Sequence, residues 1–79
     1  MKYIIFEDFS GQAIPVLFPD RIEHGELREQ MPYSTVLAAG YVNHSGGGFV
    51  CHGESKTLGA VAGQGDAAVI ERHFQQGEP

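Results

Sequence analysis

The side chains that could most readily bind a metal or react lie in one stretch, Asn43 to Ser55, which reads NHSGGGFVCHGES. It holds two His residues, the single Cys and a Glu around three consecutive Gly residues. His, Cys and Glu are ligands that zinc accepts in proteins, and a Cys thiolate is a nucleophile. Two interpretations follow: a metal or redox site, or a β-hairpin whose strands carry polar side chains.

Strand geometry favours the hairpin. Successive side chains of a strand point to opposite faces, so Cys51 and His52 are not expected to reach the same metal ion. Cys51 should share one face with Phe49, while Val50 and His52 share the other. A free Cys beside an aromatic residue usually behaves as a small core residue.

A metal site would need a different set of ligands. The candidates are His44 and His52 together with a carboxylate or His73, or His52 and Glu54 on one strand face. Zinc sites with strong sequence signals contain two ligand pairs, each spaced about two to four residues apart. That pattern is absent, so no residue is assigned as a metal ligand, and whether His44, His52 and Cys51 bind a metal stays open.

Two other functional motifs, a phosphate-binding loop and a nucleophile elbow, are excluded by the residues that surround them. The glycines at 46–48 lack the Lys-Ser/Thr of a phosphate-binding loop and precede an expected strand rather than a helix. They are expected to supply positive φ angles in a hairpin tip. Ser55 lies in Gly53-Glu54-Ser55-Lys56-Thr57, which lacks the final Gly of a nucleophile elbow. The chain is therefore expected to have no catalytic residue and no cofactor, and not to be an enzyme.

The elements that would position these residues follow from apolar patterning. Strands are expected at residues 3–6, 13–18, 34–42 and 49–58, with a loop at 43–48 and a flexible connection at 59–65. The first strand should be buried on both faces or central, and should form a hairpin with the second. Pro15 indicates that the second strand lies at an edge or is bulged near Pro15. Gly40 indicates a bulge or a close backbone approach, and Gly53 indicates a bulge.

Two helices are expected, a short one at 25–31 and an amphipathic one at 66–75. His24 should lie at the start of the first, and Asp66 should cap the second. The face of the second helix that should contact the sheet contains Ala67, Val69, Ile70 and Phe74. The face that should point away contains Glu71, Arg72 and Gln75.

The predicted fold class is α+β: a small, mostly antiparallel sheet of about four strands with a short middle helix and a C-terminal amphipathic helix. The 79 residues form one small domain, 1–79. A chain of this length buries only about 60% of its unfolded surface. A metal, a partner subunit or an economical core would have to compensate. One Cys excludes an internal disulfide and indicates a reducing compartment.

The charge pattern argues against nucleic acid as a partner. The net charge is −5, and the five basic residues are scattered along the chain. No apolar run approaches the ~20 residues that span a bilayer, and the N-terminus is expected to be a strand rather than a signal peptide. We therefore expect a cytoplasmic protein that does not bind membranes.

The segments FPDRIEHGEL, AAGYV, GESKTLG and GDAAVIERHF make the chain similar to short uncharacterised proteins of tailed phages and bacterial prophages. That group has no assigned activity. The resemblance implies expression in the bacterial cytoplasm, or presence in the virion.

Three hypotheses about function remain. The first is a non-enzymatic phage or prophage structural or protein-interaction protein that forms a homo-oligomer, because edge strands invite pairing. The second is a small acidic binding module that acts on a host protein. The third is a metal-binding or enzymatic domain that uses His44 and His52, with or without Cys51.

Overall fold

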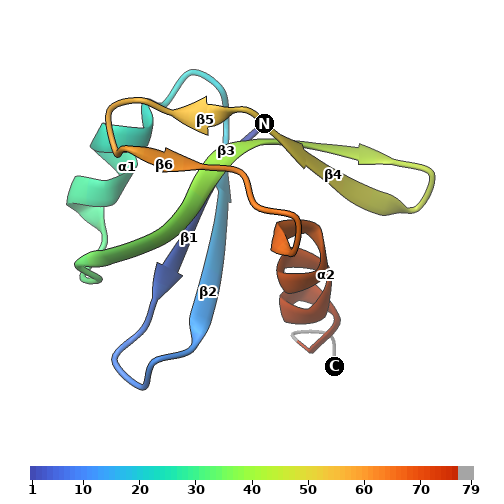
Figure 1. Cartoon of the computed structure of the whole chain (residues 1–79), viewed down its shortest axis with the longest axis horizontal. Helices are drawn as coiled ribbons and strands as arrows, with labels where there is room; N and C mark the ends of the chain where they lie inside the picture. The colour runs from blue at the N-terminus through green and yellow to red at the C-terminus, as the bar shows by residue number, and fades with distance from the viewer. Residues whose placement is uncertain (77–79) are drawn as a thin grey trace.

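A four-stranded antiparallel sheet with the strand order β2-β1-β3-β4 organises the fold (Figure 1). The computed structural model describes residues 1–76. The sheet consists of β1 (Lys2–Glu7), β2 (Ala13–Phe18), β3 (Thr35–Ser45) and β4 (Gly48–His52). The other elements are the short pair β5 (Glu54–Ser55) and β6 (Ala60–Val61) and the helices α1 (His24–Gln30) and α2 (Asp66–Gln76). The predicted α+β class is confirmed.

The central position of β1 follows from its composition, which is aromatic and β-branched. Its side chains alternate between two apolar clusters, so Tyr3 and Ile5 lie on one face and Ile4 and Phe6 on the other. All four are buried. The expectation of a central strand in a hairpin with β2 is confirmed.

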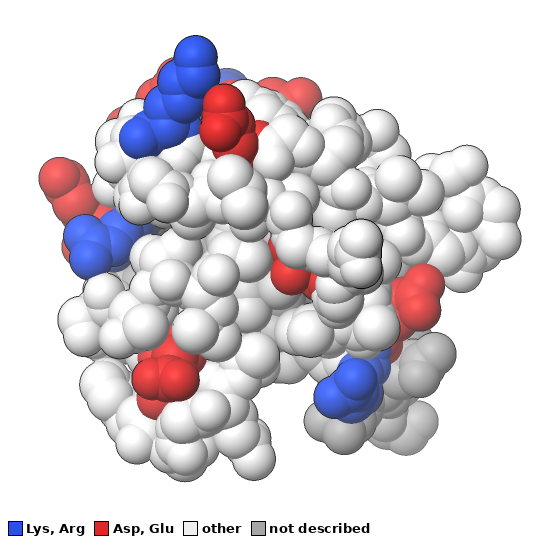
Figure 2. Space-filling model, in the orientation of Figure 1, with Lys and Arg blue, Asp and Glu red and all other residues white. Residues whose placement is uncertain are grey.

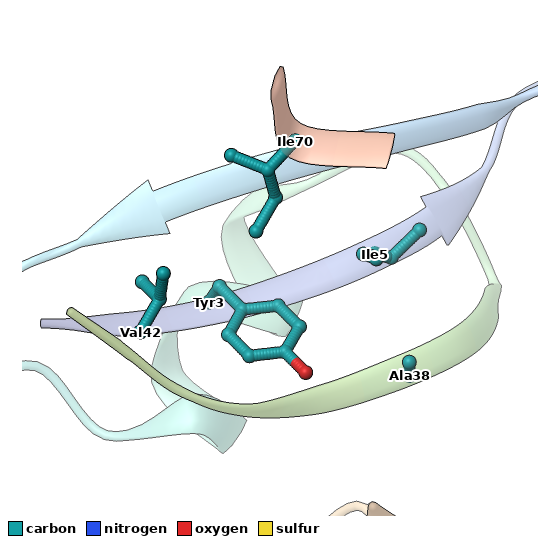
Figure 3. Packing of buried hydrophobic residues seen from close by; sticks show 5 residues of the cluster. All are labelled: Tyr3, Ile5, Ala38, Val42 and Ile70. Carbon is teal, nitrogen blue, oxygen red and sulfur yellow. The ribbon is translucent and has the colours of Figure 1, made fainter. Parts of the chain in front are cut away.

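Helix α2 covers the first face of the sheet. Ile70 points from α2 toward Tyr3 of β1, with Val42 of β3 nearby (Figure 3). Its side chain is fully buried, which contributes about 1.5–3 kcal/mol of apolar burial. Ile70 is therefore the main anchor of α2.

The second face is covered by α1 and by the segment that joins β5 to β6. Leu27 of α1 and Leu58 pack against the buried Ile4, Phe6 and Phe18. The helix begins at His24 rather than Gly25, and Glu26 accepts a hydrogen bond from the Glu23 amide at 3.2 Å. This bond joins the residue before the helix to a side chain of its first turn, and so fixes where the helix starts.

The two edges of the sheet are β2 and β4. Pro15 lies in β2 opposite Ile5, so its predicted edge position is confirmed. At the other edge, the expected loop at 43–48 is wrong. Gly46 and Gly47, with φ of 59° and 82°, form a two-residue turn of the kind that matches strand twist, so β3 runs on to Ser45.

The expected strand 49–58 is also wrong, because it is interrupted. Gly53 has a φ of +80°, which ends β4 and directs the chain into the separate β5–β6 pair. The segment 59–65, expected to be an irregular connection, contains β6.

Gly40 is a point of close backbone approach, as predicted. A Cβ atom there would lie 2.6 Å from the His52 carbonyl oxygen and 3.3 Å from the Ala62 Cβ. The bulge of β3 lies elsewhere. Ile5 pairs with Ala38 and Phe6 with Val36, which leaves Leu37 as the extra residue and half-exposed.

Helix α2 differs from expectation at Glu71. Its carboxylate does not point away from the sheet, because it accepts a hydrogen bond from the Phe49 amide of β4 at 3.3 Å. Phe74 contacts the Phe49 ring at a centroid distance of 6.4 Å. The side chain of Gln75, expected to point outward, lies outside the described residues.

Candidate functional site

The stretch from Asn43 to Ser55 is a hairpin for most of its length. In the β3–β4 register, Val42 pairs with Cys51 and His44 with Phe49. Phe49 and Cys51 pack against the cluster beneath α2, whereas Val50 and His52 lie on the opposite face and are exposed. The predicted division of faces is confirmed.

The two His residues of the hairpin are not brought together. His44 contacts Phe49, with ring centroids 5.0 Å apart, on the α2 side of the hairpin. His52 stacks on Tyr41 at 5.8 Å on the other side, and its Nε2 lies 3.4 Å from the side-chain Nδ2 of Asn43. Because they lie on opposite faces, they do not converge on one metal ion.

The remaining candidate ligands are dispersed. Glu54 follows the break at Gly53 and pairs with Val61 in the second sheet. The Ser55 hydroxyl is buried and accepts the Leu58 amide at 3.4 Å. Among residues 1–76, no three His, Cys, Asp or Glu side chains are grouped so that they could hold a metal ion.

A buried polar contact lies beneath the hairpin. The Tyr3 hydroxyl donates a hydrogen bond to the Asp66 carboxylate, which also accepts the Gly63 amide at 2.7 Å. Burial raises the pKa of Tyr3 far above its usual value, and the hydrogen bond to Asp66 and its charge act in the same direction. The carboxylate lies at the first turn of α2, where the helix dipole favours negative charge.

Cys51 lies beside this contact. Its pKa is raised, mainly by burial, while a hydrogen bond with Tyr3 opposes the shift and the charge of Asp66 adds to it. A thiol with a raised pKa carries little thiolate at neutral pH and is a poor nucleophile or metal ligand. Cys51 therefore behaves as the small core residue that its position beside Phe49 predicts.

His24 is a buried polar residue whose partner was missed from the sequence. It begins α1, as expected, but its Nε2 lies 3.0 Å from the Gly40 carbonyl oxygen of β3 instead of bonding its own turn. Its ring meets Phe18 and Tyr41 edge-on, at 5.4 and 5.8 Å. No local signal could reveal this, because the partner is distant in the sequence.

A cleft of about 320 Å³ lies between the start of β2 and α2. It is lined by Gln12, Ala13, Ile14, Val69, Arg72 and His73. His73, considered above as a metal ligand, belongs to this cleft and meets Phe74 edge-on at 5.3 Å. The lining combines apolar and polar side chains.

Comparison of the chain with protein-family models, with curated proteins and with solved structures found no match. Within residues 1–76, neither helix has the length and apolar character needed to cross a membrane.

Proposed function

We propose that this chain is a non-enzymatic structural or protein-interaction protein of phage or prophage origin and that it forms a homo-oligomer. The observation that carries the proposal is the edge strand β4. It lies within residues 30–53, a region without Lys, Arg, Asp or Glu.

Exposed edges normally carry features that prevent pairing with another chain, such as charged side chains, Pro or a bulge. The β2 edge has Pro15. The sequence of β4, Gly-Phe-Val-Cys-His, contains neither Pro nor a Lys, Arg, Asp or Glu. Its apolar side chain Val50 is 53% exposed. An edge of this kind favours association once the Glu71 carboxylate, which holds the Phe49 amide at 3.3 Å, is displaced.

The distribution of charge supports a second copy as the partner. Two chains of net charge −5 repel each other, so contact is easiest where charge is absent. The β3–β4 hairpin projects from the body (Figure 1) and appears without Lys, Arg, Asp or Glu in the space-filling view (Figure 2). An approach of one hairpin to another meets no like charges on the hairpins themselves, and the nearest carboxylate is that of Glu71 in α2, which holds the Phe49 amide.

The non-enzymatic part of the proposal rests on the titratable groups of the hairpin. Cys51 has a raised pKa, and His44 and His52 are separated by the sheet. The phage or prophage origin rests on the resemblance of the sequence segments described above, and it would place the protein in the bacterial cytoplasm or the virion.

Native mass spectrometry of the untagged chain, from micromolar to nanomolar concentration, tests the proposal. We expect a dimer or larger homo-oligomer of unmodified mass that dissociates on dilution. A monomer at every concentration would contradict self-association, and a stoichiometric metal mass would favour the metal-binding hypothesis instead.

A further inference from the structure

The hydrogen-bonding direction of each residue in β4 follows from the turn that precedes it. In a two-residue hairpin the residues that flank the turn, here Ser45 and Gly48, exchange backbone hydrogen bonds. Backbone groups then alternate along the strand, so those of Phe49 and Cys51 point away from β3. The bond from the Phe49 amide to Glu71 agrees with this direction.

The same alternation applied to β2 gives a different edge. The Asp8 amide donates to the Gln12 carbonyl at 2.8 Å, so the outward-facing residues of β2 are Ala13, Pro15 and Leu17. Pro15 lacks an amide hydrogen and removes the middle donor of that edge. Of the two edges of the described sheet, β4 is thus the one with consecutive outward donors.

We propose that two copies of this chain pair through β4, antiparallel, about a two-fold axis at Val50; this inference rests on the self-association proposed above. In this register Phe49 lies opposite Cys51 of the partner subunit, and the two residues exchange both backbone hydrogen bonds. The same exchange is repeated on the other side of the axis. The four-stranded sheets of the two copies then form one continuous sheet.

The register is self-complementary in its side chains. Val50 faces Val50 of the partner subunit at a position without backbone hydrogen bonds, where Cα atoms lie about 4.5 Å apart. Both Val side chains, exposed in the single chain, cover one another. Pairing also requires that Glu71 release the Phe49 amide, to which it is bound at 3.3 Å, so the carboxylate competes with the partner strand.

The first test compares Val50→Lys with Val61→Lys by sedimentation velocity over a concentration series. The two residues are similarly exposed, at 53% and 59%, but Val61 lies in β6. Val50→Lys places two like charges opposite each other and is expected to raise the dimer dissociation constant by roughly tenfold or more. Val61→Lys should leave it unchanged. Equal effects of the two variants would overturn the inference.

A second test reads the register without destabilising the strand. In a Cys51→Ala background, Val50→Cys should form an intermolecular disulfide under mild oxidation, because the predicted Cα separation suits that bond. Val61→Cys in the same background should remain monomeric on a non-reducing gel. Absence of the Val50→Cys crosslink in a protein that still dimerises would overturn this register.

The outcomes separate the two proposals. A wild-type chain that stays monomeric removes both the homo-oligomer and the β4 interface. A wild-type oligomer that tolerates Val50→Lys and does not crosslink through Val50→Cys keeps the homo-oligomer and removes the β4 interface.

Discussion

The hydroxyl of Tyr3, on the central strand β1, donates a hydrogen bond to the carboxylate of Asp66, at the first turn of α2. Both side chains are buried. The contact joins the beginning of the chain to its last helix. Buried carboxylates are tolerated only where hydrogen bonds satisfy them, and here the Gly63 amide supplies another. The bond therefore fixes where α2 docks on the sheet.

Removal of the Tyr3 hydroxyl should destabilise the fold. Tyr3→Phe leaves a buried carboxylate with one donor fewer, which typically costs about 1–3 kcal/mol. Tyr33→Phe is the control, because it deletes a hydroxyl from a half-buried ring that contacts Phe6. Urea unfolding at pH 7 measures both variants. Equal stability of Tyr3→Phe and wild type would contradict the role of this bond.

The same contact predicts a loss of stability at alkaline pH. The pKa of Tyr3 is raised on folding, so its contribution is fully present below the unfolded pKa of about 10 and is lost as pH rises beyond it. Urea unfolding of wild type and Tyr3→Phe between pH 8 and about 11 should show a larger loss in wild type, because the raised pKa of Cys51 contributes to both proteins. Parallel curves would contradict it.

The Cys51 thiol is expected to react slowly. Its pKa is raised, mainly by burial, so the thiolate fraction at pH 8 is below that of an exposed Cys. Alkylation by iodoacetamide, followed by mass spectrometry, should be several-fold slower in the folded chain than in the same chain in guanidinium. A folded-state rate equal to the unfolded rate would show that the thiol is accessible and not perturbed.

Gly40 should tolerate no side chain. A Cβ there would lie 2.6 Å from a backbone oxygen, and forced repacking of this kind costs about 1–3 kcal/mol. Gly65→Ala is the matched control, because no atom lies within 4 Å of the added Cβ and its φ is not positive. Thermal unfolding should show a lower midpoint for Gly40→Ala only. Similar midpoints for the two variants would argue against close approach at Gly40.

Asp8 should stabilise the β1–β2 turn in a pH-dependent way. Its pKa is lowered by hydrogen bonds from the Gln12 amide and from Ser10. A lowered pKa means that the stabilisation is present above the unfolded value and is lost as pH falls through the folded value. Titration of the Asp8 carboxyl by NMR should give a midpoint below 3.8. A midpoint at or above that value would exclude these hydrogen bonds in solution.

Local sequence signals were enough to predict several elements. The apolar run around Ile4 indicated a buried strand, Pro15 indicated an edge, and the spacing of Ala67, Ile70 and Phe74 indicated α2. Each signal comes from residues within one element. The division of faces at Cys51 and His52 could likewise be predicted, because alternation in a strand is a local rule.

Contacts between distant segments could not be predicted in this way. The Glu71 carboxylate looks like part of a solvated helix face until the β4 amide of Phe49 is placed beside it. His24 finds its partner, Gly40, on another element. Gly53 could have stayed within one bulged strand, and its sequence neighbours do not show that β6 packs against β3 after the break.

The order β2-β1-β3-β4 has a consequence for how the chain reaches this fold. The β1–β2 and β3–β4 hairpins close over short loops and can form early. Because β1 and β3 come from distant parts of the chain, their pairing has the larger entropic cost of loop closure. The docking of one hairpin on the other is then the slow step. Truncation of Ile5 or Ala38 should slow refolding, and changes confined to the far tip of β3–β4 should mainly alter the rate of unfolding.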